Sequence, residues 1–238
     1  MDLIIRIKTD FKKAANPGKA ALLARFFKTG KGEYAEGDRF HGLTVPQTRL
    51  LSKKYGALPL SRLKRLLNSP WHEERLCALL MLVENFRCGT EKEKAVIYHF
   101  YLGNTRYINN WDLVDLSAPR IVGGWLADKS KAPLFTLARS KDLWEKRVSI
   151  IACFEFIYAG RAEPALKIIK IHLRDPHDLI HKAAGWMLRE IGKRCSEKIL
   201  LDFLKKNYHA LPRTTLRYAI EKFPPAKRAR LLAGNFSG

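Results

Sequence analysis

Two tryptophans and one aspartate are the residues of this sequence best suited to chemistry on a cation. Trp111 and Asp115 are four residues apart, so on a helix they lie one turn apart on the same face. Trp186 follows later in the chain, with Arg147 between them. Aromatic faces attract cations, and a carboxylate stabilises a developing positive charge. The set therefore suits a positively charged group, such as a cationic base or an oxocarbenium-like sugar.

Some of these residues also have an ordinary structural explanation. A tryptophan at helical spacing usually packs in a core, and this applies to Trp111 and Trp186 taken singly. An acidic residue at the start of a helix favours the helix dipole, which accounts for Asp112. Asp115 lies too far inside the same helix to act as a cap.

The elements that must position these residues are predicted to be helices. Short breaks rich in proline and glycine separate stretches with helical periodicity, and no run of residues alternates as a strand does. Residues 37–46 form the one long irregular stretch. In one stretch, apolar residues recur every fourth position on a single helix face, at Leu179, Ala183, Met187 and Ile191.

An internal repeat organises these helices. Similar helical segments open with a basic or aromatic residue about 35 residues apart, at Arg75, Trp111, Arg147, Lys182 and Arg217. A first helix fits before each of them, for example over residues 163–173. This period predicts an all-α fold, a HEAT-like helical-pair solenoid (α-α superhelix) whose second helices line a concave face. We expect one domain over residues 1–238, with an N-terminal helical cap over 1–60 and helical-pair repeats over 61–238.

The charge of the chain indicates a polyanionic partner. There are 44 Lys and Arg against 23 Asp and Glu, a formal net charge of +21, and 47% of residues are hydrophobic. The excess therefore belongs to a packed body rather than to a disordered tail. Four of the five repeat-opening residues are cations, and the same face continues beyond Lys182 through Trp186, Arg189 and Lys193. Such a column can follow a phosphate backbone, although single cations are also typical of any solvated helix face.

Other features exclude several classes of protein. The four cysteines have no metal-binding spacing, so we expect reduced, mostly buried thiols and neither metal nor cofactor. Neither a signal peptide nor a membrane span is recognisable. We therefore expect a cytoplasmic monomer, associated with the nucleoid when it acts on DNA.

Four segments resemble the AlkD-type alkylpurine DNA glycosylases of the DNA alkylation repair superfamily, and the resemblance runs over most of the chain. They are Asn110-Trp111-Asp112-Leu113-Val114-Asp115, Lys182-Ala183-Ala184-Gly185-Trp186-Met187-Leu188-Arg189-Glu190, Trp144-Glu145-Lys146-Arg147, and residues 40–49 (FHGLTVPQTR). The first two are fairly specific when they occur together at this distance.

The resemblance implies a HEAT-like solenoid that holds duplex DNA and excises N3- or N7-alkylated purines. It assigns the catalytic aspartate to Asp115, the two aromatic residues of a shallow cleft to Trp111 and Trp186, and a DNA-backbone contact to Arg147. It also implies DNA contacts by the N-terminal segment, at Thr44 and Arg49. Phe26 stands where a tyrosine is expected, and Thr44 where the family can carry glutamine, so these N-terminal contacts differ from the family pattern.

Elementary chemistry agrees with that role. Ordinary glycosidases use two carboxylates, one of them as the acid for the leaving group. An N3- or N7-alkylpurine already carries a positive charge and leaves as a neutral base, so one carboxylate suffices. Two alternatives remain: a non-catalytic HEAT-repeat protein that binds bent or branched DNA, and a scaffold for acidic proteins.

Overall fold

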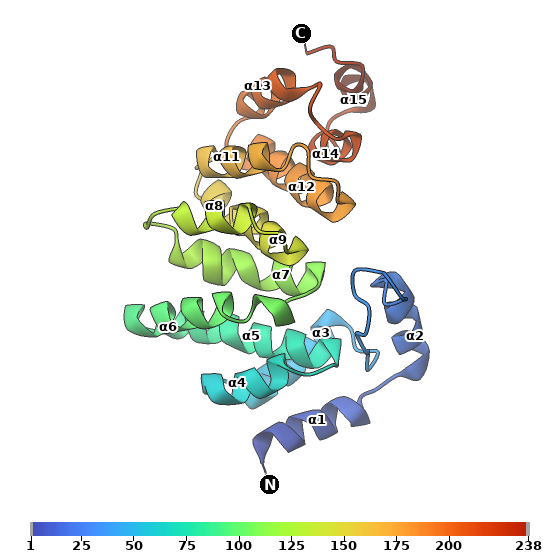
Figure 1. Cartoon of the computed structure of the whole chain (residues 1–238), viewed down its shortest axis with the longest axis vertical. Coiled ribbons are helices and arrows are strands. Elements are labelled where there is room, and N and C mark those ends of the chain that lie inside the picture. The colour runs from blue at the N-terminus through green and yellow to red at the C-terminus, as the bar shows by residue number, and fades with distance from the viewer. Residues whose placement is uncertain (1, 237–238) are drawn as a thin grey trace. The chain divides into compact units, whose positions relative to one another are not determined.

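The computed structural model describes residues 2–236, and all of its regular elements are helices (Figure 1). In these residues the one β pairing is an isolated bridge between Arg39 and Trp71. The all-α prediction is confirmed, and the helices are consistent with a helical repeat solenoid. The chain divides into two compact units, Met1–Ile121 and Val122–Gly238.

The first unit is built around one long helix. Helix α5 packs against α3, α4, α6 and α7, while α1 packs against α3 and α4. Leu76, Leu79 and Leu82 of α5 are fully buried in this core. The bounds are α1 (Leu3–Lys13), α2 (Pro17–Phe26), α3 (Val45–Tyr55), α4 (Leu60–Leu67), α5 (His72–Cys88), α6 (Glu91–Leu102), a 3-10 turn (Thr105–Tyr107) and α7 (Trp111–Ala118).

The second unit centres on α12. This helix packs against α9, α10, α13 and α14. Of the expected apolar stripe, Ala183, Met187 and Ile191 are fully buried, whereas Leu179 in the first turn is half-buried. A short π-helix (Pro119–Gly123) contains the residues at which the two units join in the sequence. The bounds are α8 (Ala132–Ala138), α9 (Leu143–Ile151), α10 (Phe154–Tyr158), α11 (Glu163–Ile171), α12 (Asp178–Arg194), α13 (Glu197–Asn207), α14 (Arg213–Ala219) and α15 (Pro225–Leu232).

Gly185 makes the tightest of these helix contacts possible. A Cβ at this position would lie 2.5 Å from Tyr218 Cβ and 2.7 Å from the Thr215 carbonyl oxygen of α14. Contacts this short are not tolerated, so α12 and α14 can approach only where the side chain is absent. Helix packing therefore explains the glycine of the Gly-Trp motif. It also fixes the position of the next residue, Trp186, on α12.

The helix breaks are where proline and glycine place them, but four of the five repeat-opening residues do not begin their helices. Caps set the helix starts: α9 begins after Asp142, whose side chain accepts from the Trp144 and Glu145 amides, and α12 begins after His177. Arg147 and Lys182 are consequently the fifth residues of their helices. Of the five repeat-opening residues, Trp111 alone begins a helix.

The irregular stretch is longer than expected at one end and shorter at the other. It runs over residues 27–44, and Val45 and Pro46 already belong to the first turn of α3. Proline fits the first helical turn because no intrahelical bond is lost there. Thr44 caps α3 and forms a reciprocal capping box with Gln47.

Two further observations concern cysteines and hydropathy. Cys77 and Cys153 are buried, Cys195 is half-buried and Cys88 is exposed, and all four are free thiols. Among residues 2–236, none of the helices has the length and apolar character needed to cross a bilayer.

Candidate functional site

Trp111 and Asp115 both lie on α7, and aromatic packing orients Trp111. Asn110 is the N-cap of α7, and its side chain accepts from the Trp111 amide at 2.8 Å. The indole stacks on Phe27 with ring centroids 5.1 Å apart and an interplanar angle of 16°. Phe26, which is 62% exposed, meets the same indole edge to face at 5.9 Å. Trp111 is thus half-buried and held on one side by two rings from the end of α2.

Asp115 is half-buried on the second turn of α7. The helix behind it is tied to α6, because Tyr101 Oη and Ser117 Oγ lie 2.9 Å apart. Burial, together with the charge of Asp115, raises the pKa of Tyr101, so its phenol stays neutral. The α7 residues therefore present one carboxylate and one indole one turn apart, as the sequence predicts.

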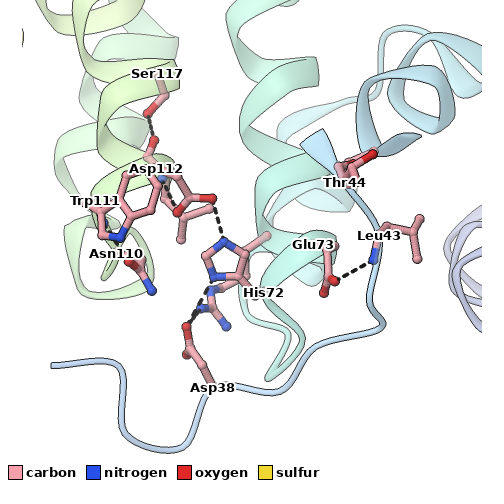
Figure 2. Close-up of polar contacts among 12 residues, drawn as sticks. Asp38, Leu43, Thr44, His72, Glu73, Asn110, Trp111, Asp112 and Ser117 are labelled. Atoms are coloured by element: carbon pink, nitrogen blue, oxygen red, sulfur yellow. Dashed lines mark hydrogen bonds and ion pairs between the residues drawn. The ribbon is translucent and has the colours of Figure 1, made fainter. Parts of the chain in front are cut away.

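A buried charge network lies beside the start of α7 (Figure 2). His72, the first residue of α5, places Nε2 2.8 Å from Asp112 Oδ2 and Nδ1 3.3 Å from Asp38 Oδ2. Arg75 donates to the same Asp38 oxygen at 2.6 Å.

The two carboxylates favour the charged form of His72, whereas the nearby Arg75 charge opposes it. Burial alone would lower the pKa of His72, but the charge and hydrogen bond of Asp112 and the hydrogen bond of Asp38 outweigh it and raise that pKa to about 9. Burial alone would raise the pKa of Asp38, but the His72 hydrogen bond and the Arg75 charge hold it below its ordinary value. At neutral pH His72 is therefore charged and Asp38 is ionised.

The N-terminal segment is fastened to α5 by a second carboxylate. Glu73 accepts from the backbone amides of His41, Gly42 and Leu43 at 2.8 to 3.1 Å, and the contact to Leu43 is drawn in Figure 2. Gly42 has φ +89°, and a Cβ there would lie 2.2 Å from the Asn16 carbonyl oxygen, so only glycine fits. This anchoring places Thr44 at the start of α3, and both Thr44 and Arg49 are exposed.

The structure corrects the prediction that Arg75 belongs to an exposed cationic column. Its side chain is 3% exposed, pairs with Asp38 and donates to the Ser69 carbonyl oxygen at 3.0 Å. Because α5 begins at His72, Arg75 lies in its first turn, close to the loop that carries Asp38. The buried Asp38 carboxylate compensates the charge of Arg75. Arg75 therefore binds Asp38 within the protein instead of facing a partner.

The remaining site residues predicted from the sequence lie in the second unit. Arg147 is 5% exposed and donates from Nη1 to the Leu179 carbonyl oxygen at 2.6 Å, which ties α9 to α12. Trp186 is half-buried, with its ring 6.1 Å from that of Phe154.

The cations of α12 differ in how far they are neutralised within the protein. Lys182 pairs with Asp178 at 2.7 Å, and Arg189 pairs with Glu221 of the segment after α14. Lys193 is exposed. Two of these three cations thus already have a carboxylate partner, and the roles of all three at DNA stay predictions.

Sequence reasoning missed the network itself. Asp112 was accounted for as a helix-start residue; it does lie in the first turn of α7, but its carboxylate also pairs with His72. His72 and Asp38 carry no local signal because their partners are 40 and 34 residues away in sequence. Over residues 2–236, no group of His, Cys, Asp or Glu side chains has the geometry of a metal site.

Comparisons with known proteins identify the family. A family model described as DNA alkylation repair enzyme matches residues 7–223. A solved structure described as a predicted DNA alkylation repair enzyme from Enterococcus faecalis is similar in fold, with a TM-score of 0.67 and 19% sequence identity, over 89% of this chain and 97% of that one. No curated protein matches the sequence significantly. The match over most of its length shows that the chain belongs to the DNA alkylation repair enzyme family.

Proposed function

We propose that this protein is a monofunctional DNA glycosylase that hydrolyses the N-glycosidic bond of N3- or N7-alkylated purines in duplex DNA. The observation that carries the proposal is the position of two side chains one turn apart on α7. One is the half-buried Asp115 carboxylate, and the other is the Trp111 indole, which Phe27 holds in place. Membership of a DNA alkylation repair family supports DNA as the partner.

The reaction needs little from the protein because the substrate carries its own leaving-group activation. As the C1′–N9 bond breaks, its electron pair moves to the purine and cancels the positive charge of the alkylated base. The sugar becomes oxocarbenium-like, and Asp115 stabilises that charge and orients water. The water oxygen bonds to C1′ and releases one proton, which leaves an abasic site and a neutral alkylpurine.

The aromatic residues bind the cationic nucleotide before the bond breaks. A cation over an indole face gains about 1–2 kcal/mol when it is desolvated, so Trp111 favours the charged, alkylated base over its neutral parent. Trp186 is proposed to have the same role. Lys182, Arg189, Lys193, Thr44 and Arg49 are proposed to contact the DNA backbone. Arg147 is almost as buried as Arg75, so its proposed role is to support α12 through the Leu179 carbonyl oxygen.

The direct test is release of 3-methyladenine or 7-methylguanine from methylated duplex DNA. Purified protein is incubated with the DNA without added metal, and free bases and abasic sites are both counted. We expect equal amounts of the two, well above the buffer control. Tight binding to bent or branched DNA with no base released would contradict the proposal and support a non-catalytic DNA-binding protein.

A further inference from the structure

His72 occupies a position that connects three separate parts of the first unit. It is the first residue of α5, is 2% exposed, and contacts the Asp38 loop through one ring nitrogen and α7 through the other. Figure 2 shows the ring between Asp38 and Asp112, with Trp111 on the adjacent position of α7. One buried side chain thus bridges the N-terminal loop and the helix that carries the candidate site.

The same side chain also belongs to the aromatic stack under Trp111. The His72 ring centroid lies 4.8 Å from Phe27 and 4.7 Å from Phe40. Phe27 in turn stacks on Trp111. The orientation of the indole is therefore linked to His72 by two routes, through Asp112 along the chain and through Phe27 in space.

The hydrogen bonds require a particular state of the ring. Both ring nitrogens face carboxylate oxygens, and only the imidazolium has a donor on each nitrogen. A neutral ring would turn a lone pair towards one of the two carboxylates. The charged groups that face the ring are Asp38 from the loop, Asp112 from α7 and Arg75 from α5, and the other neighbours are the Phe27 and Phe40 rings. The raised pKa of His72, about 9, agrees with a charged ring.

We propose that protonated His72 is a positioning residue for the α7 site: it joins Asp38 to Asp112 and thereby fixes the first turn of α7, the Trp111 ring and the Asp115 carboxylate one turn on. The part of this inference that concerns catalysis rests on the proposed glycosylase activity. The positioning itself is a property of the protein alone and is measurable without DNA.

The test compares His72→Gln with His41→Gln. Glutamine cannot donate from two ring positions, so α7 loses its connection to the loop. His41 is a matched control, because it is equally buried, but it contacts α5 and the N-cap of that helix instead of α7: it pairs with Glu74 at 3.1 Å and stacks on Trp71. Both variants remove a buried histidine from the same unit.

Three readouts separate positioning from mere stability. Nitrogen NMR of the wild type should show both His72 ring nitrogens protonated at pH 7.5. Amide hydrogen exchange over residues 111–118 should accelerate in His72→Gln and not in His41→Gln. In single-turnover excision, the maximal rate constant should fall about 10–100-fold in His72→Gln, because a displacement of about 1 Å has that effect on a reacting geometry. The protein concentration that gives half of the maximal rate should change little.

Each possible result either supports or overturns the positioning role of His72. A neutral His72 ring at pH 7.5, or equal exchange over residues 111–118 in both variants, overturns the proposal. If the wild type excises nothing, the proposed function fails, and ring protonation with exchange still decides the positioning. If His72→Gln does not fold, Asp38→Asn replaces it: this variant should lower the pKa of His72 and accelerate exchange in α7, and an unchanged pKa would overturn the proposal.

Discussion

Trp111 is packed on one face and remains partly accessible, which fits the ligand-binding role proposed for it. Its indole buries one face on Phe27 and keeps part of its surface accessible. Trp144, by contrast, is 7% exposed. The intermediate burial of Trp111 is what a residue that must bind a ligand in a fixed orientation requires.

We predict different effects for the two phenylalanines that contact Trp111. Phe27→Ala should lower the free energy of unfolding by about 3 kcal/mol, because Phe27 is buried among Phe40, His72 and Trp111. Phe26→Ala should change it by less than about 0.5 kcal/mol, because that ring is largely exposed. Urea denaturation followed by tryptophan fluorescence measures both. Equal losses in the two variants would show that the stack does not support Trp111.

The protonation of His72 predicts a stability change at alkaline pH. Its pKa is about 9 in the folded protein and about 6.5 in the unfolded chain, so folding favours the charged ring. The stabilisation, on the order of 3 kcal/mol at 1.4 kcal/mol per unit, is fully present below pH ~6.5 and lost as the pH rises to about 9.

Urea midpoints at pH 6 and pH 9.5 test this prediction. We expect the wild type to lose free energy of unfolding over that range, and His72→Gln to lose much less. A wild type and variant with the same alkaline slope would refute a charged His72.

At the scale of helices, close packing explains why the sequence has a glycine directly before Trp186. Gly185 permits the approach of α12 to α14, and Trp186 is the next residue. Gly192 lies on the same helix, but a Cβ there would meet the Cδ2 tip of Leu200 at 2.6 Å. A side-chain tip can rotate away, whereas the Thr215 backbone cannot.

The two glycines therefore make a matched pair of substitutions. Gly185→Ala should destabilise the protein by about 1–3 kcal/mol through overpacking. Gly192→Ala should be neutral or slightly stabilising, because alanine is the better helix former. Thermal denaturation measures both changes in stability. A Gly185→Ala variant no less stable than Gly192→Ala would mean that α12 and α14 are not in close contact.

Helices and their breaks were predictable because both depend on neighbouring residues. Proline and glycine mark the breaks, and the stripe of apolar residues identifies the buried face of α12 from Ala183 onwards. The pairing of Trp111 with Asp115 was predictable for the same reason. The burial of Arg75 was not, because its partner Asp38 comes from a loop 37 residues earlier. Side-chain partners across such distances are fixed by tertiary packing, which periodicity does not report.

For the molecule as a whole, the net charge of +21 predicts DNA binding that is strongly salt-dependent. The cations engaged within the protein should contribute least to it. Lys193 on α12 and Lys167 on α11 are both exposed, but Lys167 pairs with Glu163 at 2.7 Å. Substituting either residue by alanine removes one charge, so the two variants have the same net charge.

We expect the two variants to differ in their salt slopes. Lys193→Ala should reduce the slope of log K against log salt by about 0.9, the value for one lost phosphate contact. Lys167→Ala should leave the slope as in the wild type. Fluorescence anisotropy with a duplex at several salt concentrations measures both, and identical slopes would argue that DNA does not lie along the α12 cations.

The central claim, that Asp115 carries out the chemistry, is tested most directly by one rate. The single-turnover rate of 7-methylguanine excision is measured under saturating protein for the wild type, Asp115→Asn and, as a control, the exposed Asp128→Asn. We predict that Asp115→Asn excises at least about 100-fold more slowly, since a lost charge in the transition state costs about 3 kcal/mol or more, with duplex affinity retained. An Asp115→Asn variant as fast as the wild type would contradict the account.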